Sequence, residues 1–398
     1  MIPRDDRPLP AGFQSAPANF SPELQLVLAV VRTALGTDGF AGAVGPTSEG
    51  GWQKFSREVA RQRLGPFLFH RLPATITAAL PAAVVQRLQR AAEITAQHAD
   101  RQAGELVRLV QTLEAAGIRT LSVKGPLLSL QLYGSTGLRH GSDLDLVVPP
   151  EDAGRADALL RRVGCERIRP DFELTPRQQR EYLRVQYEFE YSSPDSRLRV
   201  ELMWRLEGVS DRLDIWTSPD RLELNGHSFH LLPPELNALY LCVHGARHGW
   251  CRLFWLLDVA LLLRRDEIDW EKTLALARAH GAERSVLQAG RLARRLFAAT
   301  LPAAFRSSPA EARIVAGLSA EACRQIALKP EDENGTIEWF RQLLYRLRLS
   351  RGARARLAVL QPHFVSLSSW KMVRLPDRWF ALYHVLTPFL WLYRRCAR

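Results

Sequence analysis

The 398-residue sequence lacks any run of about 18 uncharged apolar residues, so we expect no membrane-spanning helix. Its N-terminus carries acids and prolines instead of a basic stub followed by an apolar run, which argues against a secretory signal peptide. The five cysteines are odd in number and include no CxxC pair, so we predict no disulfide framework and no structural zinc site. These absences predict a reduced, cytoplasmic protein.

Acidic residues are nearly missing from positions 341–398, where twelve Arg and Lys stand against a single acid, Asp377. This segment therefore holds a net charge of +11 out of the formal +12 of the whole chain. The remainder is close to neutral, which argues against a globally basic nucleic-acid-binding protein. The final stretch, "RWFALYHVLTPFLWLYRRCAR", interleaves aromatic residues with arginines. Three interpretations stay open for it: a helix packed on the body, a peripheral membrane or protein contact, and a nucleic-acid contact.

Five segments follow from the pattern along the chain. Residues 1–20 are predicted to be disordered, and residues 21–117 have the apolar spacing of helices. Residues 118–233 mix β-like runs with helices and contain a predicted hairpin, "QYEFEYSS" and "RLRVELMW". Helical patterns return over residues 234–330, and residues 331–398 are a basic, aromatic-rich helical tail. We therefore predict an α+β protein, with a small mixed-sheet core flanked by N- and C-terminal helical domains.

The run "SDLDLVV" places Asp143 and Asp145 at the head of an apolar strand. Successive side chains of a strand point to opposite faces, so the two aspartates share one face. Two like charges on one face keep their charge best beside a cation. In "LRVELMW", Glu201 lies on that same face if its apolar neighbours face the core. Three carboxylates at one site predict binding of Mg²⁺, or Mn²⁺, for in-line phosphoryl transfer.

Two further acids compete with Glu201 for the third position. Glu188 and Glu190 alternate with aromatic residues in "YEFEY", on the first strand of the predicted hairpin. Their polar alternation is typical of a strand with a solvated face. We therefore prefer Glu201.

A candidate phosphate-binding turn precedes the aspartates. Lys124 and Gly125 follow a short β-like run and stand directly before Pro126, a residue suited to the first turn of a helix. A glycine at a helix N-terminus lets backbone N–H groups approach a phosphate. Lys124 and Arg139 are candidates to neutralise triphosphate charge, and Ser142 is a candidate cap or phosphate contact. For Arg139 the alternative is an ion pair with a nearby aspartate that holds the loop.

This order of motifs resembles the nucleotidyltransferase fold of polymerase-β-like enzymes: Lys-Gly, then a helix, then "YGSTGLRHGSDLDLVV". More narrowly, the chain resembles a bacterial family of uncharacterised nucleotidyltransferases, and "HGARHGWCRLFWLLDVALLL" is similar to the helical segment of that family. The superfamily has Gly-Gly or Gly-Ser at the first turn, where this chain has Lys124-Gly125. Its third acid is usually an aspartate before Leu-His-Trp, and here Glu201 stands before Leu-Met-Trp.

The resemblance implies a metal-dependent, nucleotide-binding transferase. Such an enzyme moves a nucleoside monophosphate from an NTP, with ATP the first candidate, to a hydroxyl and releases pyrophosphate. Asp143 and Asp145 would bridge the metals, and Glu201 would hold the metal beside the acceptor and help deprotonate it. The acceptor is a small molecule, peptide or protein, with nucleic acid less favoured. The alternatives are a catalytically inactive nucleotide-binding or scaffold member of the same fold, and an RNA-directed transferase.

Two histidines in "HGARH" have the i, i+4 spacing of metal ligands on a helix. His244 and His248 lack the glutamate of the HExxH motif, however, and no third ligand is evident from the sequence. We therefore expect these histidines to pack in the core or to hydrogen-bond to Asp258.

Overall fold

The computed structural model describes residues 17, 20–37, 48–194, 198–209, 214–218, 220–328, 336–364 and 366–396. The segment predicted to be disordered, residues 1–20, lies outside the described residues except for Pro17 and Phe20. Over the described ranges, every helix is too short or too polar to cross a membrane.

A five-stranded mixed sheet forms the centre of the chain and has the order β1-β2-β5-β4-β3. The pair β2–β5 is parallel, and the other three pairs are antiparallel. The predicted hairpin is confirmed as β4–β5. The prediction of an α+β fold with a small mixed sheet is confirmed as well. The strands are β1 (Leu121–Ser122), β2 (Asp143–Val147), β3 (Glu166–Arg169), β4 (Glu188–Ser192) and β5 (Arg199–Met203).

The two faces of this sheet differ sharply in chemistry. One face carries six buried apolar side chains, which pack with α5 and α7 in one hydrophobic cluster: Leu144, Leu146, Phe189, Tyr191, Val200 and Leu202. The alternate residues of the same strands point to the other face, because side chains alternate along a strand. On that face Val147 and Met203 contribute to a second cluster together with α9, and the remaining positions are polar. The polar face is the one that bears the acids.

Helices from both ends of the chain share the second hydrophobic cluster. The clustered residues include members of the N-terminal helices α1, α2, α3 and α5 and of α9 to α14, so segments far apart in sequence form one core. The division of the chain into separate N- and C-terminal helical domains stays a prediction. The N-terminal helices are α1 (Pro22–Leu35), α2 (Glu49–Arg61), α3 (Gly65–Arg71), α4 (Ala74–Ala79) and α5 (Ala82–Ala115); the later ones are α9 (Pro234–Arg247), α10 (Leu253–Leu262), α11 (Trp270–Ala279), α12 (Glu283–Phe297), α13 (Pro309–Ala327) and α14 (Thr336–Leu349).

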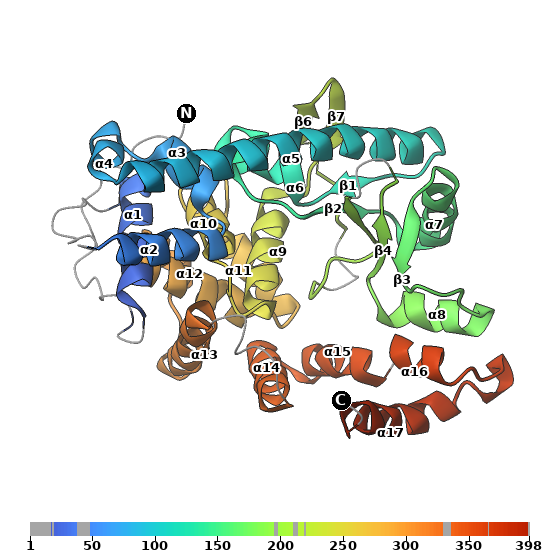
Figure 1. The fold of residues 1–398 in the computed structure, drawn as a ribbon. Coiled ribbons are helices and arrows are strands. Elements are labelled where there is room, and N and C mark those ends of the chain that lie inside the picture. Colours follow the sequence, from blue (N-terminus) through green and yellow to red (C-terminus); the bar gives the residue numbers. More distant parts are fainter. Residues whose placement is uncertain are drawn as a thin grey trace.

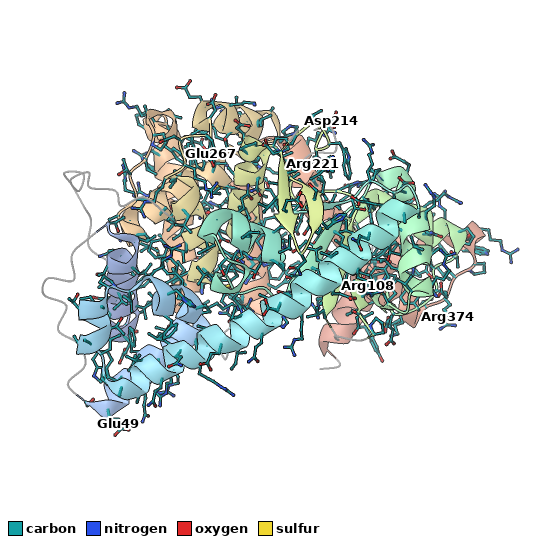
Figure 2. All side chains as sticks on the ribbon, turned by 90° about the horizontal axis from the view of Figure 1, so that it is seen from above. Glu49, Arg108, Asp214, Arg221, Glu267 and Arg374 are labelled. Carbon is teal, nitrogen blue, oxygen red and sulfur yellow. The ribbon has the colours of Figure 1, made fainter. Side chains whose placement is uncertain are left out.

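The 34-residue helix α5 connects these two parts of the molecule (Figure 1). Its first half packs with the N-terminal helices, and its second half, from Ala103 to Leu113, packs on the apolar face of the sheet. Figure 2 shows it from above as one long helix running diagonally across the molecule. The remaining elements around the sheet are α6 (Gly125–Tyr133), α7 (Ala153–Arg162), α8 (Pro176–Val185) and the two-stranded ribbon β6 (Arg221–Leu224) and β7 (His227–His230).

The basic tail continues as α15 (Ala353–Phe364), α16 (Leu367–Met372) and α17 (Leu382–Cys396). Trp370, Phe380 and Tyr383 are buried in the cluster that also holds the apolar face of the sheet. This part of the tail therefore packs on the body. Four apolar residues spaced three or four apart along α17 are exposed: Leu382, Val385, Phe389 and Tyr393. A contact between this stripe and a membrane or a protein partner stays a prediction.

Candidate active site

Asp145 and Glu201 come together because their strands run parallel and in register. The pairing of β2 with β5 sets Asp145 directly opposite Glu201. The antiparallel pairing of β5 with β4 then sets Glu201 opposite Glu190, so three acids form a row across three strands. Paired residues lie on the same face of a sheet, and Asp143 shares it with Asp145. The structure therefore places the three predicted acids, Asp143, Asp145 and Glu201, on one face.

The expectation of a solvated face for β4 is wrong. Glu188 and Glu190 lie on the acidic face beside Glu201, and Glu190 is only 9% exposed. Its carboxylate is compensated, because Arg169 lies 3.1 Å from one oxygen and Arg199 lies 3.5 Å from the other. The acidic face continues across β4, where it meets basic residues.

Lys124 is the cation closest to the predicted metal ligands. Its Nζ lies 2.6 Å from Oδ1 of Asp145, and both side chains are almost completely buried. Burial alone would lower the pKa of Lys124, but the charge of Asp145 and of its neighbours raises it well above the usual value. Lys124 is therefore a permanent cation at the centre of the acidic face.

A single ammonium does not balance the carboxyl groups around it. Burial, together with the charges of Asp145 and Glu188, raises the pKa of Glu201 to about 10. Burial and the charge of Glu207 raise the pKa of Glu188 to about 8. At neutral pH the protein therefore keeps protons on carboxyl groups that would be ionised in water.

These carboxyl groups fit a divalent cation in the chemistry of their donor atoms. Mg²⁺ and Mn²⁺ prefer carboxylate oxygens, and a cation at this face would take the place of the protons that Glu201 and Glu188 retain. Over the residues that the structure describes, the ligand oxygens of Asp143, Asp145 and Glu201 do not all lie within 4.8 Å of one another.

The turn between β1 and α6 brings Gly125 beside the backbone of Asp143 and Lys124 beside the side chain of Asp145. Gly125 begins α6 in the left-handed region, with φ +60°, a conformation that glycine adopts at little cost. A Cβ at this position would lie 3.6 Å from the backbone oxygen of Asp143, so the N-terminus of α6 abuts the start of β2. Gly134, in contrast, ends α6, as the sequence indicates.

Arg139 belongs to a separate, compact network. Its Nε donates hydrogen bonds to both carboxylate oxygens of Asp258, at 3.0 and 3.1 Å. The hydroxyl of Tyr133 donates a third, at 2.7 Å, and the guanidinium stacks 5.1 Å from the ring centre of Phe254. The three polar side chains are buried. This is the ion pair that the sequence left open as the alternative role of Arg139. Its partner comes from α10, 119 residues later in the chain.

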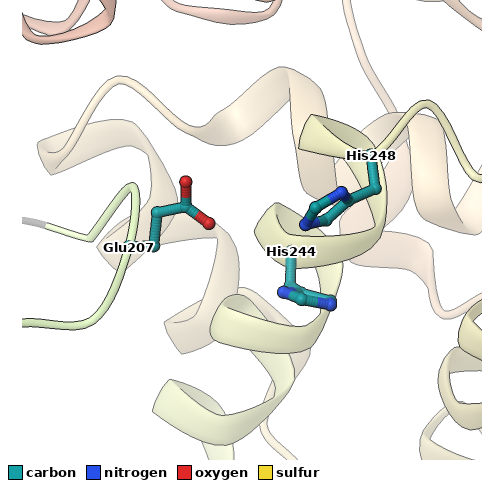
Figure 3. A group of neighbouring side chains, drawn as sticks. All are labelled: Glu207, His244 and His248. Carbon is teal, nitrogen blue, oxygen red and sulfur yellow. The ribbon is translucent and has the colours of Figure 1, made fainter. Parts of the chain in front are cut away.

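Of the two roles expected for His244 and His248, the structure shows packing: both rings contact Trp255, whereas the hydrogen bonds to Asp258 come from Arg139 and Tyr133. Both rings also face Glu207, which follows β5 (Figure 3). In the described part of the chain, these three residues are the only His, Cys, Asp or Glu side chains whose ligand atoms all lie within 4.8 Å of one another. The sequence could not reveal Glu207 as the third member because 37 residues separate it from His244.

A cavity of about 690 Å³ opens beside the loop that leads into β2. It lies between α2, α3 and α5 and reaches His140, three residues before Asp143. Its wall is mostly apolar and includes the basic side chains of Arg57, Arg63 and Arg87. Ser142, on the same loop, is exposed to solvent.

Comparison with known proteins gives one match. A family described as uncharacterised nucleotidyltransferase matches residues 48–298, which span α2 to α12 and include the entire sheet. The comparison found no match among curated proteins and none among solved structures. The family predicted from the sequence and its activity class, nucleotidyl transfer, are thereby confirmed.

Proposed function

We propose a reaction for this chain, which belongs to the uncharacterised nucleotidyltransferase family. It transfers a nucleoside monophosphate from an NTP to a hydroxyl group and releases pyrophosphate. The observation that carries this proposal is the row of carboxyl groups on β2 and β5, in which buried Asp145 pairs with a single buried lysine. ATP is the donor to test first. We also propose that the protein works in the cytoplasm, where both ATP and Mg²⁺ are available.

Three residues are proposed to hold Mg²⁺ or Mn²⁺: Asp143, Asp145 and Glu201. The bound cation would neutralise charge that develops on the phosphate oxygens during in-line displacement. Lys124 would remain beside Asp145 and fix the orientation of that carboxylate. The N-terminus of α6, entered through Gly125, would bind the triphosphate through backbone N–H groups. Ser142 would contact the phosphates from the loop before β2.

In the proposed reaction the acceptor oxygen attacks the α-phosphorus and forms the new P–O bond. The bond from the α-phosphorus to the bridging oxygen breaks, and pyrophosphate leaves with its electron pair. Ionised Glu201 would take the proton from the acceptor hydroxyl. For this role Glu201 must first lose the proton that its raised pKa retains, and a cation held at the acidic face would favour that loss. Arg139 is proposed to act indirectly, by holding the loop before β2 through Asp258.

The cavity beside His140 is the proposed entrance for the acceptor. On α5 the cavity reaches Thr95. Gln102 lies two helical turns, or about 10 Å, further along this helix, and its side chain donates a hydrogen bond to the backbone oxygen of Asp143. The apolar wall of the cavity and its arginines suit a small acceptor with an apolar body and an anionic group. Arg87→Glu should then weaken acceptor use. Arg90→Glu is the matched control, because Arg90 lies on the same helix but does not line the cavity.

The experiment that tests the function compares two labelled forms of ATP. Purified protein is incubated with cell extract, Mg²⁺ and ATP labelled at either the α- or the γ-phosphate. Nucleotidyl transfer attaches the α-label to an acceptor and leaves the γ-label in pyrophosphate. Attachment of the γ-label would indicate phosphoryl transfer and contradict the proposal. Absence of transfer with every NTP would favour the inactive, nucleotide-binding alternative, and labelled RNA would favour the RNA-directed one.

A further inference from the structure

Glu207, His244 and His248 form a cluster outside the acidic face that nucleotidyl transfer does not use. His244 lies on α9 and His248 directly follows it, so the i, i+4 spacing puts both rings on one side of the helix. Glu207 reaches them from the loop after β5 (Figure 3). The ligand atoms of all three residues lie within 4.8 Å of one another. Tetrahedral Zn²⁺, with bonds near 2.0–2.1 Å, requires ligand atoms about 3.4 Å apart, so only a small inward movement is needed.

We infer that Glu207, His244 and His248 form a binding site for one Zn²⁺ ion, separate from the proposed Mg²⁺ site. Two imidazoles and one carboxylate are a ligand set that zinc uses in proteins, with water in the fourth position. Mg²⁺ prefers oxygen ligands, so nitrogen donors distinguish this cluster from the acidic face.

The surroundings hold the three ligands in place. Arg247 forms an ion pair with Oε1 of Glu207, and this pairing fixes the carboxylate of Glu207 opposite the histidines. Trp255 packs against both imidazoles, with ring centres 5.3 Å from His244 and 5.2 Å from His248. Supporting contacts of this kind orient metal ligands and tune their affinity.

The backbone near Glu207 is shaped for close contact with α9. Gly208 has φ +74°, and a Cβ there would lie 2.6 Å from Cγ1 of Val243. Only glycine allows the loop to come this near, and the approach brings Glu207 opposite the histidines. A zinc ion would therefore fasten the segment that follows Glu201 to α9. On the same side of α9, Tyr240 lies one turn before His244, and its ring centre is 5.9 Å from Nζ of Lys124. The proposed zinc site thus stabilises elements that also border the acidic face.

The test uses the full chain, stripped with a chelator and titrated with Zn²⁺ in competition with a chromophoric chelator. We expect one Zn²⁺ per chain. We expect Glu207→Gln to weaken binding at least about 10-fold, and His248→Ala at least about 100-fold. His227→Ala is the matched control, since His227 also lies beside a glutamate, Glu114, at 3.2 Å, but does not belong to the cluster. Co²⁺ bound in place of Zn²⁺ should give the visible absorption of a tetrahedral site in wild type and in the control.

Thermal melts recorded in chelator show whether each variant is folded before titration. His248 is exposed at the end of α9, so its variant should fold even without metal. Asp145→Asn should bind Zn²⁺ like the wild type, which separates failure of this site from failure of the proposed nucleotidyl transfer. Two results would overturn the inference. In the first, the wild type binds no Zn²⁺ at micromolar concentration; in the second, folded His248→Ala binds Zn²⁺ as tightly as the wild type.

Discussion

Two buried ion pairs lie close to the start of β2, and they differ in how their charges balance. Arg139 and Asp258 form one pair, in which the carboxylate accepts hydrogen bonds from the guanidinium and from Tyr133. Lys124 and Asp145 form the other, and further carboxyl groups crowd around them. One cation meets one anion in the first network, whereas in the second one cation meets an excess of acids.

This difference separates a structural pair from a candidate functional one. A balanced, fully hydrogen-bonded pair is stable without any additional partner, so its role is complete within the folded chain. An excess of buried carboxyl groups is unfavourable for the isolated protein, as the pKa of about 10 for Glu201 indicates. A group of carboxyl groups that is unfavourable in the isolated protein is therefore a candidate ligand-binding site. A divalent cation is the ligand that fits carboxylate oxygens.

The largest effect should come from breaking the unbalanced cluster. Asp145→Asn and Asp143→Asn should each lower turnover by a factor on the order of 10³ or more, because each removes a proposed ligand of the charge-neutralising cation. Asp145→Asn should also lower stability, since it deprives buried Lys124 of its nearest partner. Turnover is measured by transfer of the α-label. A variant at either position with wild-type turnover would remove that residue from the site.

Breaking the balanced pair should affect stability instead. Asp258→Asn leaves the Arg139 guanidinium buried without its charge partner, which should cost roughly 3–5 kcal/mol of unfolding free energy. Chemical denaturation measures this loss, with Asp266→Asn as an exposed control on the segment after α10. Turnover per folded molecule should stay within a few fold of wild type. A large loss of turnover with unchanged stability would instead place Arg139 in direct contact with the nucleotide.

The unbalanced cluster should also make stability depend on pH. The carboxyl group of Glu201 has its pKa raised from 4.5 to about 10, so between these values the folded protein binds a proton that the unfolded chain releases. The metal-free protein should therefore lose stability as the pH rises from about 5 to 10. Glu201→Gln removes this titration, and its melting temperature should fall less between pH 6 and pH 9 than that of wild type. Melts in chelator measure the difference, and Glu271→Gln, at an exposed helix position, should follow wild type.

The smallest effects should distinguish the two acids of β4. Glu190 is balanced by Arg169 and Arg199, which are themselves more than half exposed, so Glu190→Gln should cost about 0.5–1 kcal/mol. Glu188, whose pKa is raised to about 8 by burial and by Glu207, is not balanced in this way, so Glu188→Gln should leave stability unchanged or raise it. Both variants should change turnover only mildly. A defect at Glu190 as strong as that of Asp145→Asn would transfer the role of third ligand from β5 to β4.

The alternation of side chains was enough to predict that Asp143, Asp145 and Glu201 share a face, because this property is local to each strand. The parallel pairing that sets Asp145 opposite Glu201 is not local, since 56 residues separate them. For the same reason the sequence could name an ion pair as one role of Arg139 but could not name Asp258 as its partner. Glu207 escaped detection because it precedes His244 by 37 residues and meets the two histidines only through the fold.

The solvated face expected for β4 failed for a different reason. The alternation in "YEFEY" reports that one face is polar, but it does not report what covers that face. In the fold, Arg169 of β3 and Arg199 of β5 pair with Glu190, which is only 9% exposed. Polarity therefore identified the acidic face without revealing that it is buried.

Calorimetric titration of Mg²⁺ into the protein with a bound, non-hydrolysable ATP analogue tests the central claim most directly. Performed in buffers of different ionisation enthalpy, it counts the protons released as the cation binds. We predict that wild type binds Mg²⁺ with proton release and that its affinity rises with pH by up to about tenfold per unit below the pKa of Glu201. Asp145→Asn should lose this binding, and folded Asp258→Asn should keep it. Equal Mg²⁺ binding by wild type and Asp145→Asn, or binding without proton release, would contradict the assignment of the buried carboxyl groups to a metal site.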